Sequence, residues 1–212
     1  PQPAVVVERR RAHDGLVGPR CLEVDVAPVR GQLADEARVI QEVTATFTRN
    51  EGKAPQGWMG AGAYENPTTP DLLKEAGYKY LMDWPCDDQP IWVRTRSGPI
   101  LGVPYPVEIN DSPAVVHRQH SAREFCDMIV DQFDEMIEQC AKQPLVCNVS
   151  IHPYVCGQPF RLHPLRAVFR HCVEHKLKDR VWFCKPGDIS DYCYTLPPGT
   201  ILGAGPGAKK QL

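Results

Sequence analysis

The sequence predicts an α/β protein, built either as a barrel or as an open wound sheet. Short apolar runs alternate with segments of helical period, which is the pattern of strand–helix units. Residues 145–151 form a nearly continuous apolar run, as is typical of a parallel strand covered on both faces. The chain has 212 residues and is 42% hydrophobic, so it can bury one sizeable core. We therefore expect one main domain.

Two helices are expected in the first half of the chain. Residues 33–50 place apolar side chains at helical spacing, and Gly52 ends that pattern. Thr69, followed by a proline and an acid, has the composition of a helix start. The short helix over residues 71–76 then ends at Gly77.

A longer helix is expected after Ser121, because Ser121 and Glu124 form a capping box. One stripe of apolar side chains follows the box, which predicts a buried helix face. The stripe consists of Phe125, Ile129, Phe133, Met136, Ile137 and Cys140. Two further helices are expected over residues 165–173 and 187–194.

Four strands are clear in the pattern, over residues 78–83, 100–103, 145–151 and 181–184. Four strands are too few to close a barrel. Residues 1–32 differ in kind, because they are rich in Arg, Val and Pro and have no helical period.

The chain divides into a divergent N-terminal segment over residues 1–32, a main domain over residues 33–203 and a disordered tail over residues 204–212. The formal net charge is −2, so overall charge gives no case for a nucleic-acid or anionic-membrane partner. No apolar run approaches the ~20 residues that span a bilayer. We expect a soluble cytoplasmic protein.

Nine cysteines are present, an odd number without a Cys-x-x-Cys pair. Several lie on apolar faces, as Cys126 and Cys140 do beside the stripe after Ser121. Because free cysteine packs like a small apolar side chain, we interpret most of them as buried thiols rather than as a zinc or disulfide framework. Free thiols in this number indicate a reducing compartment.

Polar side chains follow three of the predicted strands, at the strand ends where α/β folds keep their chemistry. In chain order they are Asp87, Asp88, Glu108, Asn110, Asp111, His152 and Arg161. His152 ends an apolar strand and is followed by Pro153, so its imidazole is a candidate for proton transfer on a stiff backbone. Three polar clusters at the same end of successive strands favour a site.

Some of these residues also have purely structural interpretations. His152 could be a hydrogen-bonded core histidine, and Arg161 could anchor a loop. Trp58, in a glycine-rich loop after the first helix, could line a pocket or anchor that loop.

The acidic residues leave a similar choice open. Asp87 and Asp88 could bind a ligand, or they could form an Asx turn before Pro90. Glu108 and Asn110, in a segment stiffened by prolines, allow the same two interpretations.

Two histidine pairs lie away from the strand ends. His171 and His175 stand four residues apart, a spacing that can hold a metal ion. They fall in a predicted helix beside basic residues, so we interpret them as part of a solvated face. His117 and His120, just before Ser121, are interpreted as part of an exposed loop. Neither pair is assigned as a metal site.

Six segments, in order and with family-like spacing, resemble the polysaccharide deacetylase (NodB-homology) superfamily. They are PQGWMG (55–60), TPDLLKEAGY (69–78), DWPCDDQP (83–90), VPYPVEIND (103–111), SIHP (150–153) and GQPFR (157–161). The resemblance covers roughly residues 33–203 and is strongest to the allantoinase-like branch, which includes chitin deacetylase-like members. It implies a deformed (β/α) barrel that hydrolyses a carbon–nitrogen bond in an amide, such as an N-acetyl group or a cyclic ureide.

The chain also departs from the family pattern. Typical members carry an Asp-Asp pair on the first strand and a His-x-x-x-His metal pair, and residues 1–32 contain neither. The chain therefore resembles an N-terminally incomplete member whose barrel lacks its first strands. A divalent metal such as Zn²⁺ is then implied only if the missing ligands are supplied elsewhere. A partial barrel exposes strand edges, which favours pairing with a second copy.

The resemblance implies a mechanism in which His152 protonates the leaving nitrogen as general acid, because C–N cleavage stalls unless the departing amine is protonated. Asp88 or Glu108 would serve as the base for the attacking water. The substrate, an amide, a ureide or an N-acetylated sugar, would be bound by Trp58, Asp87, Asn110 and Arg161. The competing function is a catalytically inactive, truncated deacetylase-like domain that only binds a ligand or a partner.

Overall fold

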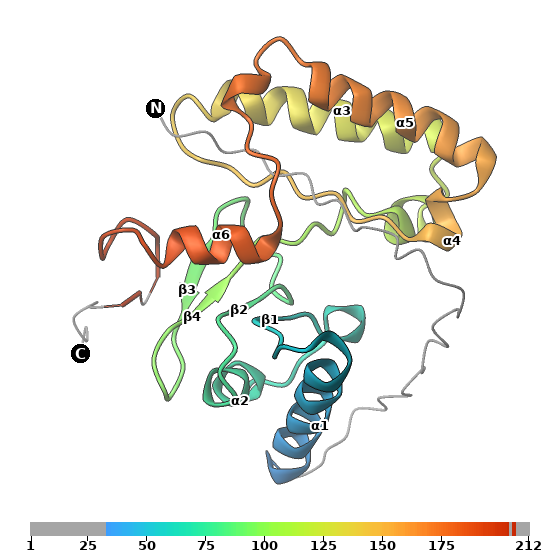
Figure 1. Cartoon of the computed structure of the whole chain (residues 1–212). Coiled ribbons are helices and arrows are strands. Elements are labelled where there is room, and N and C mark those ends of the chain that lie inside the picture. Colours follow the sequence, from blue (N-terminus) through green and yellow to red (C-terminus); the bar gives the residue numbers. More distant parts are fainter. Residues whose placement is uncertain (1–32, 204, 207–212) are drawn as a thin grey trace.

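The structure is a computed structural model that describes residues 33–203 and 205–206. The expected N-terminal segment and the expected tail, except for residues 205–206, lie outside the described residues. A small sheet with helices on both faces forms the lower part of the molecule, and a pair of long helices forms the upper part (Figure 1).

The sheet has four short strands in the order β1-β2-β4-β3. β1 (Gly57–Trp58), β2 (Tyr80–Leu81) and β4 (Ile100–Gly102) run parallel, and β3 (Ile91–Val93) pairs antiparallel with β4. The predicted α/β class is confirmed. The resemblance implies a deformed barrel, but in the described residues the four strands form an open sheet.

Two predicted strands differ in the structure. Residues 181–184 lie outside any strand, and in the run 145–151 only Ser150 forms a bridge, to Asn110. An apolar run becomes a strand only where a neighbouring segment offers a row of backbone partners. Val146 and Cys184 instead bury their side chains together in the core cluster that includes Trp92.

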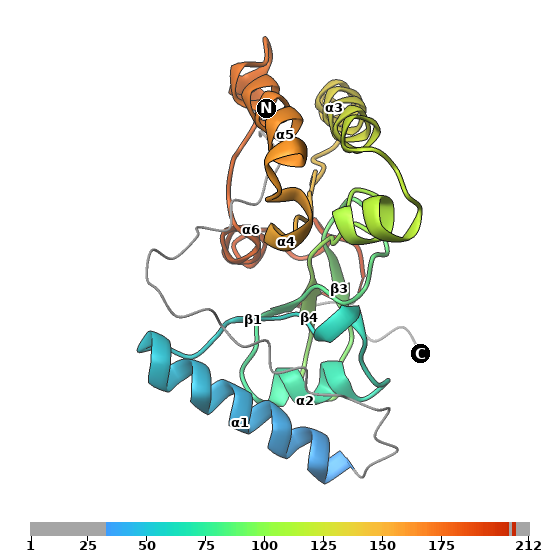
Figure 2. The same cartoon turned by 90° about the vertical axis from the view of Figure 1, so that its right-hand side faces the viewer.

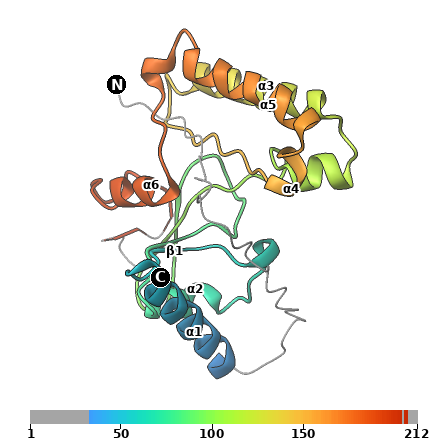
Figure 3. The same cartoon turned by 45° about the vertical axis from the view of Figure 1, so that its right-hand side comes forward.

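Side chains alternate between the two faces of the sheet, because neighbouring residues on a strand point in opposite directions. On one face, Leu101 of β4 and Trp92 of β3 pack with Ile189 of α6 (Pro186–Cys193). On the other face, Leu81 and Ile100 pack against α1 (Leu33–Glu51) and α2 (Thr69–Glu75). Figure 3 shows α6 and the α1–α2 pair on opposite sides of the strands. The sheet is therefore the middle layer of three.

The upper part consists of α3 (Ala122–Gln139) and α5 (Pro159–Glu174), which pack side by side (Figure 2). The predicted capping box is confirmed, because Ser121 and Glu124 exchange hydrogen bonds between side chain and backbone. The predicted stripe is buried, apart from Cys140, which is half-buried. These side chains form a second core with the segment 145–149.

The predicted C-terminal ends of α1 and α2 also hold, whereas α5 begins six residues before the expected position 165. α1 ends before Gly52, whose φ of +73° is the left-handed conformation that glycine adopts readily. α2 begins after Thr68 rather than Thr69. The Thr69 hydroxyl instead accepts a 2.9 Å hydrogen bond from the Asn66 backbone. Four short helical turns complete the fold: η1 (Ala61–Ala63), η2 (Ser112–His117), α4 (Pro153–Cys156) and η3 (Lys178–Arg180).

Eight of the nine cysteines lie among the described residues, and all eight are free. Six of them are buried, so the interpretation as buried thiols is confirmed for most of the set. Burial raises the pKa of Cys147 and of Cys184 to about 12, which keeps these thiols protonated. Among the described helices, none is both long and apolar enough to cross a membrane.

Candidate active site

His152 is held by Asp111, which lies 41 residues earlier in the chain. Asp111 Oδ1 is 2.6 Å from His152 Nδ1, and Asp111 Oδ2 accepts a 2.8 Å hydrogen bond from the His152 backbone N–H. The Asp111 side chain is fully buried, whereas 36% of the His152 side chain is exposed. The carboxylate fixes the proton on Nδ1 and leaves Nε2 without a partner among the described residues. An imidazole held in this way can exchange a proton through Nε2.

Backbone pairing brings these two residues together. Asn110 and Ser150 form a parallel bridge, in which the Asp111 N–H donates to the Ser150 carbonyl at 3.1 Å. The Ser150 N–H donates in turn to the Ile109 carbonyl at 3.0 Å. Asp111 and His152 follow directly after this bridge, so their side chains meet. From sequence, Asp111 is included in the polar cluster at the strand ends but is assigned no individual role.

Asn110, predicted to bind substrate, is buried and directly precedes Asp111. Its side-chain N–H donates to the Tyr105 hydroxyl at 3.2 Å, and its side-chain oxygen accepts from the Ser112 backbone at 3.1 Å. The Tyr105 hydroxyl also lies 2.8 Å from the Ser150 hydroxyl. Both ends of the Asn110 amide are therefore engaged in holding the turn that positions Asp111.

Arg161 lies near the same pair, at the start of α5. Its guanidinium donates to the Val155 carbonyl at 3.3 Å and stacks on the Phe160 ring at 4.9 Å. The pKa of the neighbouring Cys156 thiol is raised to about 12, mainly by burial and then by a hydrogen bond to Asp111 and the Asp111 charge. The charge of Arg161 opposes this rise. Asp111, His152, Cys156 and Arg161 thus form one cluster.

The predicted acids Asp87, Asp88 and Glu108 line a separate pocket of about 750 Å³ between two loops and α3. Two further acids from α3, Asp131 and Glu135, line it as well. Burial raises the pKa of Asp88, and the charges of Asp87 and Glu108 add to the rise. The pocket therefore gathers negative charge and suits groups that donate hydrogen bonds.

This acidic pocket does not include His152. Asp88 accepts a 2.8 Å hydrogen bond through its backbone carbonyl from Val146, six residues before His152. Six extended residues span up to roughly 20 Å. Glu108 stands only two residues before the bridge that leads to Asp111. The structure thus groups the predicted residues into a His152 cluster and an acidic pocket.

Trp58, the remaining predicted residue, belongs to neither group. It is half-buried on β1, and its ring meets the Tyr78 ring edge-on at 5.6 Å. Both rings belong to the core between the sheet and the α1–α2 pair. This placement matches the anchoring interpretation of Trp58.

A carboxyl pair has no counterpart among the predicted residues: Glu65, in the segment after η1, and Asp83, just after β2. Asp83 Oδ1 accepts a 2.7 Å hydrogen bond from the Gly60 backbone, and Glu65 accepts from the Trp84 indole N–H. Burial, the Asp83 charge and the contact with Asp83 raise the pKa of Glu65 to about 7, against the hydrogen bond from Trp84. Asp83 ends a predicted strand and could have been suspected from that position, whereas nothing in the local sequence marks Glu65.

The histidines predicted to lie on a solvated face are placed differently. His171 Nε2 lies 2.6 Å from Asp134 Oδ1, and His175 Nε2 lies 3.6 Å from the same oxygen. Both imidazoles meet the buried Phe133 ring edge-on. The spacing of the two histidines in sequence predicts that they are neighbours. The acid beside them comes from α3, and local sequence could not show that contact. Asp134, His171 and His175 form a group that could hold a metal ion.

The fold belongs to the polysaccharide deacetylase-like (NodB-homology) superfamily, as its similarity to solved structures shows. The crystal structure of PuuE allantoinase matches with a TM-score of 0.72 and 27% identity, over 81% of this chain and 56% of that chain. A protein from Pseudomonas aeruginosa PAO1, described as a polysaccharide deacetylase, matches with a TM-score of 0.69 and 26% identity, over 78% of this chain and 55% of that one.

A third structure, from Mycobacterium smegmatis and also described as a polysaccharide deacetylase, has a TM-score of 0.63. It is 19% identical over 80% of this chain and 60% of that chain, so it shows the fold alone. The chain therefore spans little more than half the length of the structures it matches. No family model and no curated protein matches the sequence.

Proposed function

We propose that this chain hydrolyses a non-peptide carbon–nitrogen bond, either by deacetylating an amide or by opening a cyclic ureide. The observation that carries the proposal is the His152–Asp111 pair, in which a buried carboxylate holds Nδ1 and Nε2 has no partner in the part of the chain that the structure describes. Similarity to an allantoinase and to a polysaccharide deacetylase supports this class of reaction.

His152 acts as the general acid. Water adds to the carbonyl carbon, and the C–N bond of the resulting tetrahedral intermediate breaks when the nitrogen receives a proton from His152 Nε2. Asp111 keeps the ring in the required tautomer and stabilises the imidazolium that donates this proton. Asp111 is a positioning residue, because its oxygens bind the imidazole and the backbone of His152.

The base that takes the proton of the attacking water is Asp88 or Glu108. Glu108 is the better placed of the two, because it stands two residues before the bridge to the His152 segment. Asp88 retains its own proton to higher pH, since burial and two neighbouring charges raise its pKa. Replacing Asp88 and Glu108 one at a time therefore distinguishes the two assignments, because only the loss of the base should abolish turnover.

Substrate binding is shared between the cluster and the acidic pocket. The Arg161 guanidinium offers hydrogen-bond donors to a carbonyl or carboxylate oxygen. Asp87 in the pocket accepts from N–H and O–H groups of an amide, ureide or N-acetylated sugar. Asn110 and Trp58 support the site from within the fold, through the contacts described above.

A metal ion of the kind that typical family members bind has no ligand set beside His152 in the described part of the chain. Among the described residues, the group that could hold a metal ion consists of Asp134, His171 and His175. It lies away from His152, where α3 packs against α5. No step of the reaction is therefore assigned to a metal.

The proposal is tested by hydrolysis of allantoin and of N-acetylglucosamine oligomers, each with and without added divalent metal. We expect His152→Ala to abolish turnover, and His163→Ala, which removes an exposed histidine of α5, to leave it unchanged. Circular dichroism shows whether the variants are folded. Turnover by a folded His152→Ala variant equal to wild type would overturn the role of His152. A folded wild type that binds but does not cleave these substrates would favour the binding-only function.

A further inference from the structure

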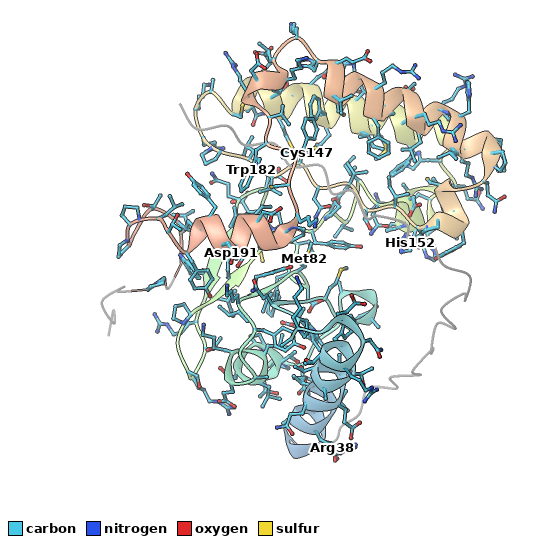
Figure 4. All side chains as sticks on the ribbon, viewed as in Figure 1. Arg38, Met82, Cys147, His152, Trp182 and Asp191 are labelled. Carbon is cyan, nitrogen blue, oxygen red and sulfur yellow. The ribbon has the colours of Figure 1, made fainter. Side chains whose placement is uncertain are left out.

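We infer that Asp134, His171 and His175 bind one divalent transition-metal ion of the zinc type and so link α3 to α5. The site lies apart from the proposed chemistry. Fourteen residues separate Arg161 from His175, which corresponds to about 20 Å at the helical rise of ~1.5 Å per residue. Figure 1 shows that α5 starts near α4 and runs to the opposite side of the molecule, and Figure 4 places His152 on the α4 side.

The donor atoms are nearly at the spacing that a metal requires. Zinc bound tetrahedrally at ~2.0–2.1 Å holds its ligand atoms about 3.3 Å apart. Asp134 Oδ1 lies 2.6 Å from His171 Nε2 and 3.6 Å from His175 Nε2, and all three atoms lie within 4.8 Å of one another. An ion therefore needs only small side-chain movements, by which Asp134 withdraws from His171.

Two helices carry or border these atoms. His171 lies in the last turn of α5, and His175 is the residue that directly follows the helix, so their rings are neighbours, with centroids 5.4 Å apart. Asp134 projects from α3, which packs against α5. The fully buried Phe133 ring lies edge-on to both imidazoles, at 6.1 Å and 5.6 Å, and limits their movement.

The site is open enough for an ion to enter and to keep one water ligand. The side chains of Asp134 and His171 are 44% and 35% exposed, whereas that of His175 is 9% exposed. Two imidazoles and one carboxylate suit zinc and its neighbours better than calcium or magnesium, which prefer oxygen ligands. The adjacent Cys172 is buried and does not belong to the group of ligand atoms that lie within 4.8 Å of one another.

Hydrogen bonds around His175 supply a reporter for metal binding. The Leu177 backbone N–H donates to His175 Nδ1 at 3.1 Å, so the ring proton of neutral His175 is on Nε2, facing Asp134. When Nε2 binds a metal, the proton must move to Nδ1 and the Leu177 N–H must leave it. This change is possible because His175 has already left the helical conformation, with φ −57° and ψ 143°.

In the experiment, a chelator first removes metal from the full chain. Zinc is then titrated into the protein, and isothermal titration calorimetry measures its binding. We expect one equivalent of zinc to bind, and His171→Ala or Asp134→Ala to weaken that binding at least ~100-fold. The matched control is the double variant His117→Ala/His120→Ala, which removes the other closely spaced imidazoles and should bind zinc like wild type. Binding that is unchanged in the His171→Ala and Asp134→Ala variants would overturn the proposal, and would point to a thiol such as the exposed Cys86.

A second measurement uses wild-type protein and does not depend on the folding of any variant. Nuclear magnetic resonance should show zinc-dependent shifts of the His171 and His175 ring nitrogens and of the Leu177 amide. The amides of α1, on the far side of the sheet, should not shift. Zinc binding that leaves the Leu177 amide and both ring nitrogens unmoved would contradict the site.

Discussion

The carboxyl groups of Glu65, in the segment after η1, and Asp83, just after β2, face each other. One oxygen of each group, Glu65 Oε2 and Asp83 Oδ2, is buried and has no hydrogen-bond donor among the described residues while both groups are ionised. A single proton on Glu65, donated to Asp83, satisfies both oxygens at once. Burial is the main cause of the rise in the pKa of Glu65 to about 7, and the Asp83 charge and this contact add to it.

The first prediction follows from that shared proton. Folded protein keeps the Glu65 proton up to about pH 7, whereas the unfolded chain loses it near 4.5. The unfolded state therefore binds fewer protons between these values, and stability falls as pH rises through them. We expect the free energy of unfolding of wild type to fall by on the order of 2 kcal/mol over this pH range, at ~1.4 kcal/mol per pKa unit and with a reduction because Glu65 is partly exposed. The Glu65→Gln variant should lack this fall.

Urea unfolding at several pH values between 4 and 8 measures this effect. Glu138→Gln, at an exposed position on α3, is the control and should retain the wild-type fall. Identical pH dependence in wild type and Glu65→Gln would show that Glu65 carries no shifted proton.

The second prediction concerns the charge of Asp111. Asp111→Asn keeps the shape of the side chain but removes the carboxylate that orients His152 and stabilises its imidazolium. We expect kcat for the substrate that wild type cleaves to fall by roughly 10²–10⁴-fold with little change in KM. Asp35→Asn, at an exposed position on α1, should leave both constants unchanged. A rise in KM with kcat intact would instead assign Asp111 to substrate binding.

The third prediction concerns the core between α3 and α5. Phe133 is fully buried there and supports both imidazoles of the inferred metal site. Phe133→Ala should lower the free energy of unfolding by about 3–5 kcal/mol, because it leaves a cavity. Phe47→Ala, at a residue that is 51% exposed on α1, should change it by less than about 0.5 kcal/mol. Equal losses in the two variants would contradict the burial pattern.

The fourth prediction concerns the start of α3. The Ser121 hydroxyl accepts a 3.2 Å hydrogen bond from the Glu124 backbone N–H. Ser121→Ala leaves that N–H without its partner and should destabilise the protein by about 1 kcal/mol in thermal or urea unfolding. Ser97→Ala removes a hydroxyl that lies 3.4 Å from Glu75 and should have a smaller effect. A negligible loss at Ser121 would mean that solvent replaces the cap.

Helices were the part of this fold that sequence predicted well, because their determinants lie within a few residues. The capping box at Ser121 and Glu124, the apolar stripe after it, and Gly52 at the end of α1 each act locally. Strands were predicted less well. The run 145–151 has strand composition, yet only Ser150 forms a bridge, because pairing depends on which other segment lies alongside.

The site residues show the same division. His152 could be singled out as the histidine that ends an apolar run, and Glu108, Asn110 and Asp111 as a polar cluster. That Asp111 is the residue bound to His152 depends on the bridge between Asn110 and Ser150, a contact across forty residues of chain. No periodicity within either segment carries that information.

Sequence by itself determined the α/β class, the capped helices, most of the buried thiols and the candidacy of His152. These follow from local chemistry, since caps, apolar periods and glycine conformations act over one or two turns of chain. Tertiary structure alone decided which acid holds which histidine: Asp111 with His152, and Asp134 with His171 and His175. Tertiary structure also brought the carboxyl groups of Glu65 and Asp83 within hydrogen-bonding distance of each other. The physical reason is that hydrogen bonds between side chains require positions within ~3 Å, and only the packed fold sets such distances between remote segments.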